Sequence, residues 1–115
     1  MRQFIYLYRG QATALTPEQG AERMAAFAAW AEKLGPALID AGSPFGTSVS
    51  VRDDGTEATA GDLIGYSIVE ADDLAAAKAF TDGLPFLSNS DGKCAVEIFE
   101  LLAMSSKYAP RHRQA

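Results

Sequence analysis

Apolar residues along the chain follow two repeat patterns, one typical of strands and one typical of helices. Residues 3–9 and 63–69 are nearly continuous runs of apolar, β-branched and aromatic residues, as in strands that are buried on both faces. Residues 47–52 alternate polar and apolar positions, and residues 53–56 after them form a hairpin-type turn sequence. We predict strands over residues 3–9, 37–42, 47–52, 57–61, 63–69 and 93–104.

A first helix is predicted after the first strand, with clear start and stop signals. Thr16 is a suitable N-cap, Pro17 suits the first helical position, and Gln19 completes a capping box. The pair Gly35-Pro36 ends the helix. The apolar stripe predicted to face the sheet consists of Met24, Phe27, Ala28, Ala31 and Leu34.

A second helix is predicted over residues 73–82, capped by Asp72 or Asp73. Leu74, Ala77 and Phe80 are expected to face inward. The resulting order, β-α-β-(β)-β-α-β, predicts an α+β fold of ferredoxin-like type, in which two helices cover one face of an antiparallel sheet. One domain is expected over residues 1–104.

The second face of this sheet needs a cover of its own. We expect it to carry Phe4, Tyr6, Tyr66, Ile68, Phe99 and Leu101. Because a large exposed apolar face is unusual on a soluble monomer, the pattern predicts a homodimer that forms through this face. A monomer whose C-terminal tail lies over the sheet is the alternative.

Composition and charge narrow the classes of partner. The 115 residues are 48% hydrophobic and 22% charged, close to the average of globular domains. Ten Lys and Arg stand against fifteen Asp and Glu, a net charge of −5. Three of the bases lie in residues 105–115, a segment without acids that we expect to be a flexible tail. An acidic chain lacks the clustered positive charge that phosphates require, so no nucleic-acid partner is expected.

The sequence also predicts a cytoplasmic protein with no membrane partner. No apolar run approaches the roughly 20 residues that span a bilayer, and the first residues lack the apolar core of a signal peptide. A lone Cys94 excludes an internal disulfide, which fits a reducing compartment.

Few residues offer metal or nucleophile chemistry. His112 is the single histidine and lies in the basic tail, where a solvated residue is expected rather than a catalytic one. Cys94 is expected to be a small buried hydrophobe. A zinc site is not expected from one His and one Cys, and neither a phosphate-binding glycine loop nor a G-x-S-x-G motif is present. We therefore expect neither metal nor cofactor.

Two carboxylates are candidates for proton acceptors. Asp40 follows an apolar stretch beside a glycine turn, where it is either a base with a raised pKa or simply the residue that caps the turn. Glu97 lies in the middle of the last strand, on the face shared with Phe99. It is expected either to line a polar pocket or to pair with Arg9 or Arg52 across a dimer.

Three hydroxyl-bearing residues are candidates for ligand contact. Tyr8 and Tyr66 would offer hydroxyls within an aromatic lining, which suits a small organic ligand. Ser43 would hydrogen-bond either a ligand or its own turn. An aromatic core is the alternative role of the tyrosines.

A series of short segments resembles the YCII-related proteins over residues 2–104. The segments are 4–8, 41–45, 65–72, 85–87 and 96–98. The resemblance implies a dimeric α+β barrel with a pocket between sheet and loops in each subunit, and some relatives are thought to be enzymes on the strength of a His and an Asp in the pocket. Relatives often place a His on the first helix, and one subgroup has an Asp-Gly-Pro-Phe motif. This chain has neither, because residues 24–30 hold no His and residues 60–63 read Ala-Gly-Asp-Leu.

Three functions remain open at this point. The first is a small homodimeric protein that binds a small organic ligand beside the sheet. The second is a cofactor-independent enzyme of lyase, isomerase or monooxygenase type, with Asp40 or Glu97 as proton acceptor and a tyrosine as donor. The third is a non-catalytic regulatory or interaction module.

Overall fold

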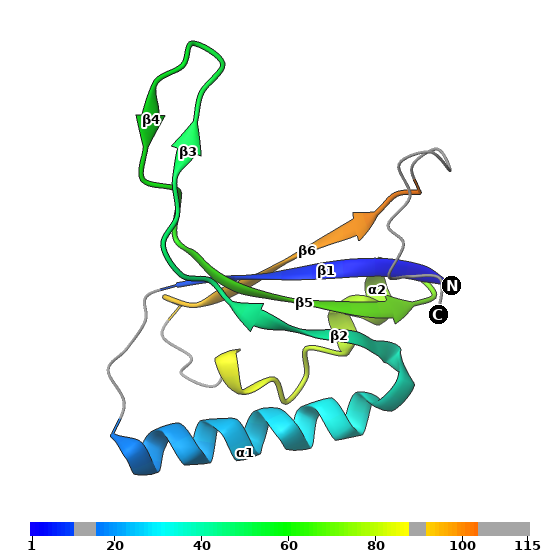
Figure 1. The fold of residues 1–115 in the computed structure, drawn as a ribbon. Helices are drawn as coiled ribbons and strands as arrows, with labels where there is room; N and C mark the ends of the chain where they lie inside the picture. Colours follow the sequence, from blue (N-terminus) through cyan, green and yellow to red (C-terminus); the bar gives the residue numbers. More distant parts are fainter. Residues whose placement is uncertain (11–15, 88–91, 104–115) are drawn as a thin grey trace.

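A four-stranded antiparallel sheet forms the centre of the molecule in a computed structural model, which describes residues 1–10, 16–87 and 92–103. The strands are ordered β2-β5-β1-β6, and both helices lie on one side of the sheet (Figure 1). The elements of this body are β1 (Arg2–Arg9), α1 (Pro17–Leu34), η1 (Gly35–Ala37), β2 (Leu38–Pro44), β5 (Leu63–Ala71), α2 (Leu74–Ala79), η2 (Pro85–Leu87) and β6 (Ala95–Leu101). The predicted ferredoxin-like α+β fold is therefore confirmed for the single chain.

The central strand β1 buries its aromatic face under the helices. Phe4 and Tyr6 are 1% and 0% exposed, and Tyr8 continues the same row. The prediction that Phe4 and Tyr6 lie on the second face of the sheet, opposite the helices, is therefore wrong. Because both faces of β1 are apolar, alternation alone could not show which row the helices cover. The face of the sheet opposite the helices, which we call the open face, carries Ile5 and Leu7 instead, and both are half-buried.

Helix α1 packs on this aromatic row. Its capping box is present as predicted, with the Thr16 hydroxyl accepting from the Gln19 backbone N–H. Trp30 is 3% exposed, and its Nε1 donates a hydrogen bond of 2.8 Å to the Phe80 carbonyl. The stripe that packs on the core consists of Phe27, Trp30, Ala31 and Leu34. The predicted stripe was displaced by part of a turn, since Met24 is 75% exposed and Ala28 is exposed as well.

Helix α2 is shorter than predicted and is anchored at two points. The Asp73 side chain caps it by accepting from the Ala76 backbone N–H at 2.8 Å. The Tyr6 hydroxyl donates to the Ala77 carbonyl at 2.5 Å, and Ala77 itself is fully buried. Leu74 does not face inward as expected, because it is the first helical residue and is 55% exposed.

A two-stranded hairpin, β3 (Ser50–Val51) and β4 (Glu57–Ala58), extends away from the sheet (Figure 1). Its turn is confirmed by the hydrogen bond from the Arg52 N–H to the Thr56 carbonyl, 2.8 Å. Both strands are much shorter than predicted, because they pair only with each other. The predicted turn at 88–92 lies largely outside the described residues, and the predicted tail 105–115 lies wholly outside them.

Edge strand β2 is irregular and approaches β5 closely at a glycine. Its register against β5 shifts on both sides of Asp40. Gly42 has φ +84°, and a Cβ on it would lie 1.6 Å from the Tyr66 carbonyl oxygen. Only glycine combines this backbone conformation with so close an approach. The approach brings the end of β2 against Tyr66 and Ser67.

We predict that Gly42→Ala destabilises the fold far more than Gly55→Ala. Gly55 has nearly the same φ, +85°, but open space around its Cβ position. It therefore isolates the conformational penalty, about 1–2 kcal/mol. The Gly42 variant must in addition separate β2 from β5. Urea unfolding of the two variants measures the difference, and equal losses of stability would show that β2 adapts freely.

Candidate functional site

A cavity of about 340 Å³ lies on the helix-covered side of the sheet. It is bordered by strands β1, β2 and β5, by helix α1 and by the segment that contains η2. Its larger apolar side chains are Met24, Phe27, Ile64, Leu84 and Phe86. All three predicted ligand residues, Tyr8, Ser43 and Tyr66, border this cavity. None of the described residues that line it is charged.

A chain of hydrogen bonds links Tyr8, in the wall of the cavity, through Ser67 to the Ala41 backbone. The Tyr8 hydroxyl lies 2.7 Å from Ser67 Oγ, and Ser67 donates to the Ala41 carbonyl at 2.8 Å. Burial raises the pKa of Tyr8, and the Ser67 hydrogen bond offsets part of that rise. The Phe86 ring lies 5.3 Å from the Tyr8 ring, centroid to centroid. Tyr8 is therefore a rigid, neutral phenol.

Sequence reasoning missed Ser67. It is fully buried, with 0% of its surface exposed, in the middle of an apolar strand. A serine at such a position needs partners inside the protein, since a buried hydroxyl without a hydrogen bond destabilises the fold. That was the available signal, but the partners come from β1 and β2 and are not visible in the local sequence.

The Tyr66 hydroxyl points away from this wall. Its neighbour Ser67 faces the helices, so strand alternation places the Tyr66 side chain on the open face. There Tyr66 donates to Asp40 Oδ2 at 3.1 Å, and the Phe45 ring stacks on it at 5.9 Å. This hydrogen bond and the negative charge of Asp40 raise the pKa of Tyr66. Tyr8 and Tyr66 thus border one cavity but direct their hydroxyls to opposite faces of the sheet.

Asp40 is occupied by two hydrogen bonds. Besides Tyr66, its Oδ1 accepts from the Gly42 N–H at 2.8 Å, the geometry of an aspartate that caps its own turn. It is half-buried, with its register partner Ile68 on β5. The structure therefore shows the turn-capping role that the sequence left open, and adds a tyrosine partner to it.

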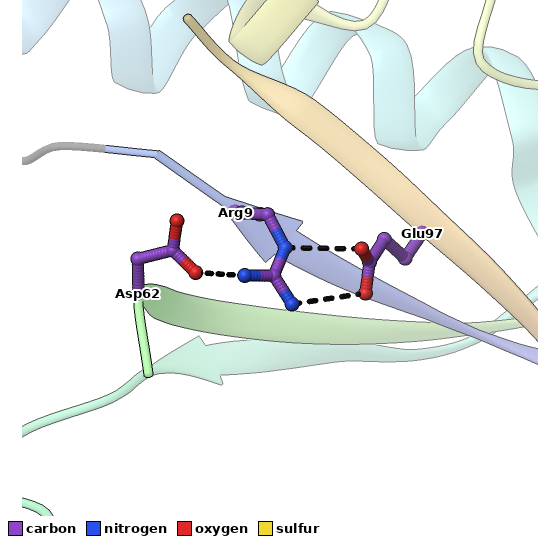
Figure 2. Close-up of polar contacts among 3 residues, drawn as sticks. All are labelled: Arg9, Asp62 and Glu97. Atoms are coloured by element: carbon purple, nitrogen blue, oxygen red, sulfur yellow. Dashed lines mark hydrogen bonds and ion pairs between the residues drawn. The ribbon is translucent and has the colours of Figure 1, made fainter. Parts of the chain in front are cut away.

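Glu97 is held by Arg9 within the same chain (Figure 2). Arg9 Nε and Nη2 donate to the two carboxylate oxygens at 3.0 and 3.3 Å, and a third nitrogen contacts Asp62. The hydrogen bond that Arg9 donates to Glu97 is the main cause of the raised pKa of Arg9. Both oxygens of Glu97 already accept N–H groups of Arg9, so neither is left without a partner for a ligand to contact. Sequence reasoning missed Asp62, which joins this cluster from the loop before β5.

Ser43 lies at the exposed rim, where its hydroxyl contacts the Pro44 carbonyl at 3.3 Å. A second cavity, about 430 Å³, lies beyond it at the base of the hairpin and is bordered largely by small residues such as Gly46 and Gly61. The first cavity is the better candidate site, because large apolar and aromatic side chains line it.

The described part of the chain shows neither a cluster of metal-ligating side chains nor a membrane-spanning helix. No group of three or more His, Cys, Asp or Glu side chains gathers there as metal ligands would. Cys94 is half-buried rather than buried, and His112 lies outside the described ranges. Neither α1 nor any other described helix combines the length and apolar character needed to cross a bilayer.

We predict that Asp40→Asn lowers the pKa of Tyr66 toward the ordinary value of 10.0. Asparagine keeps a carbonyl oxygen that can accept the hydrogen bond but removes the negative charge that opposes formation of the phenolate. A pH titration of ¹³C-labelled tyrosine by NMR measures the shift, with Tyr66→Phe to assign the signal. Glu97→Gln is the control and leaves this pKa unchanged. An unmoved Tyr66 signal in Asp40→Asn would show that the pair does not persist in solution.

The sequence of the chain matches one family of known proteins. The sequence pattern of the YCII-related domain matches residues 1–102, which covers all elements from β1 to β6. No curated protein and no solved structure matches the chain significantly. The match spans far more than half of the chain and agrees with the observed sheet and helices. The chain therefore belongs to the family of YCII-related domain proteins.

Proposed function

We propose that the protein is a small homodimer that binds a small organic molecule in the cavity beside the sheet. The observation that carries this proposal is the cavity itself, about 340 Å³ with a wall of large apolar side chains and few polar groups. Such a lining and volume are typical of sites for small organic ligands. Tyr8 and Ser43 supply the polar contacts, and Tyr66 completes the border. The ligand needs no cofactor to bind there.

The sheet face opposite the helices, over which no described helix lies, supports the homodimer. The apolar residues of this open face are Ile5, Leu7, Tyr66, Ile68, Phe99 and Leu101. Phe99 on the edge strand β6 is 53% exposed, and it pairs in register with Ile5 of the inner strand β1. The Arg9–Glu97 ion pair gives the same face a polar border. A two-fold dimer would cover the apolar centre and leave the ion pairs at the rim.

A cofactor-independent enzyme is the second candidate, and Asp40 is the residue that favours it. A half-buried carboxylate in hydrogen-bond contact with a phenol provides an acid and a base in one place. Glu97 is a weaker candidate because Arg9 holds it. A regulatory or interaction module in the cytoplasm is the third candidate, and it rests on the open face alone.

Blocking the cavity should abolish ligand binding. A thermal-shift screen against small metabolites identifies compounds that raise the melting temperature, since a ligand that prefers the native state stabilises it. We predict that Ala41→Phe, which fills the cavity from β2, removes these shifts. Ala79→Phe makes the same change on the exposed surface of α2 and retains them. Equal shifts for the wild type and Ala41→Phe would place binding elsewhere, and a screen without hits would count against the pocket.

A charge on the open face should dissociate the dimer. We predict that the wild type runs as a dimer at micromolar concentration in analytical ultracentrifugation, and that Phe99→Glu runs as a monomer. Leu74→Glu is the control, because Leu74 on the helical side has a nearly equal exposure, 55% against 53%. It should leave the dimer intact. A monomeric wild type would refute the dimer and favour a chain segment as the cover of the sheet.

A further inference from the structure

The hydrogen-bond chain behind the cavity can run in only one direction. The Ala41 carbonyl accepts and cannot donate, so the single hydroxyl proton of Ser67 must point at it, 2.8 Å away. Reversing Ser67 would leave lone pairs facing each other across that distance. The Tyr8 proton must then point at Ser67 Oγ, 2.7 Å away. The backbone of β2 thus sets the orientation of the Tyr8 hydroxyl.

With its proton used, Tyr8 offers the cavity only the lone pairs of its oxygen. The tyrosine is 9% exposed, so its hydroxyl is held in a site with little water. A ligand group with an O–H or N–H can pair with these lone pairs. A ligand acceptor, such as an ether oxygen or a carboxylate, would face them without a proton between, and a buried polar group without a partner weakens binding.

The lack of charged side chains among the described lining residues restricts the ligand further. Large side chains such as Met24, Phe27 and Phe86 are apolar, and no described residue of the lining could neutralise an anion. Two described arginines adjoin lining residues in sequence: Arg9 is already bound to Glu97 and Asp62, and Arg23, next to Met24, is not part of the lining. Transfer of an unpaired carboxylate from water into such a site is strongly unfavourable.

We propose that the cavity takes a neutral, largely apolar ligand that donates a hydrogen bond to the Tyr8 oxygen, and that Ser67 enforces this preference. The inference rests on the proposed function, since it names the class of ligand for the same cavity. It identifies Ser67 as a positioning residue: it touches no ligand, but it determines which hydrogen-bonding groups Tyr8 accepts.

Three probes of similar size test the proposal with the full chain. They are 1-naphthol, which is neutral and donates; 1-methoxynaphthalene, which is neutral and only accepts; and 1-naphthoate, which is anionic. We expect 1-naphthol to bind the wild type about tenfold more tightly than 1-methoxynaphthalene. The naphthoate should bind more weakly still. Isothermal titration calorimetry, or the fluorescence of the probes, gives the three dissociation constants.

Matched variants then locate the source of the preference. Tyr8→Phe removes the acceptor and should bring the ratio of the two neutral probes close to one. Ser67→Ala frees the Tyr8 proton to donate, so 1-methoxynaphthalene should gain affinity relative to the wild type. Tyr6→Phe is the control: it removes the hydroxyl two residues away on the same face of β1, which donates to Ala77 and does not line the cavity. Its probe ratio should equal that of the wild type.

The outcomes separate this inference from the function on which it rests. Equal binding of all three probes to the wild type, or tightest binding of 1-naphthoate, overturns the ligand class but leaves a functional pocket. A wild-type preference that survives in both Tyr8→Phe and Ser67→Ala overturns the role of the hydrogen-bond chain. Failure of every probe to bind overturns the ligand class, and together with a metabolite screen without hits it overturns the proposed function as well. Melting temperatures of the variants confirm that each one folds.

Discussion

The burial of one face of β1 is the constraint on which the other features of the molecule depend. Phe4, Tyr6 and Tyr8 form a continuous aromatic row in the central strand, and both helices pack over it. A tyrosine can be buried only where its hydroxyl has a partner. Tyr6 finds one in the Ala77 carbonyl of α2, and Tyr8 finds one in Ser67 of β5. The same row therefore positions a helix at one point and the wall of the cavity at another.

Successive residues of the irregular edge strand β2 bind side chains on opposite faces of the sheet. The Asp40 carboxylate holds Tyr66 on the open face, while the Ala41 carbonyl holds Ser67 on the side of the helices. Gly42 follows at once and allows the two strands to approach. A regular edge strand would use every carbonyl that faces β5 for a backbone hydrogen bond to that strand. The register shifts in β2 are thus what lets a backbone group orient a side chain in the cavity wall.

Local features of the fold could be predicted from the sequence, whereas choices between distant partners could not. The capping box at Thr16 and the cap at Asp73 are encoded within four residues each, and both are present. The sequence predicts the wrong covered face for β1, because apolar residues occupy both faces of this strand and only packing against α1 decides between them. Met24 and Leu74 were likewise expected inside, although the helices are rotated so that both are exposed.

In the candidate site, too, the sequence predicts which residues take part but not which distant partners they contact. Tyr8, Ser43 and Tyr66 do border one cavity, but residue types alone could not show that Tyr66 turns its hydroxyl to the other face. An ion pair between Glu97 and Arg9 is one of the roles that the sequence predicts for Glu97, but it forms within the chain rather than across a dimer. The local sequence does not indicate the roles of Ser67 and Asp62, because their hydrogen-bond partners lie 26 and 53 positions away.

The position of Trp30 has a consequence for spectroscopy. It is the single tryptophan of the chain, it is buried, and its indole N–H is bound to the Phe80 carbonyl beyond α2. Its ring lies 5.5 Å from Phe27, a residue of the cavity wall, and 6.3 Å from Tyr6, centroid to centroid. The tryptophan fluorescence of the protein, excited apart from that of its four tyrosines, therefore comes from one environment, where α1 meets the sheet. Its emission reports directly whether that helix is docked, without any label.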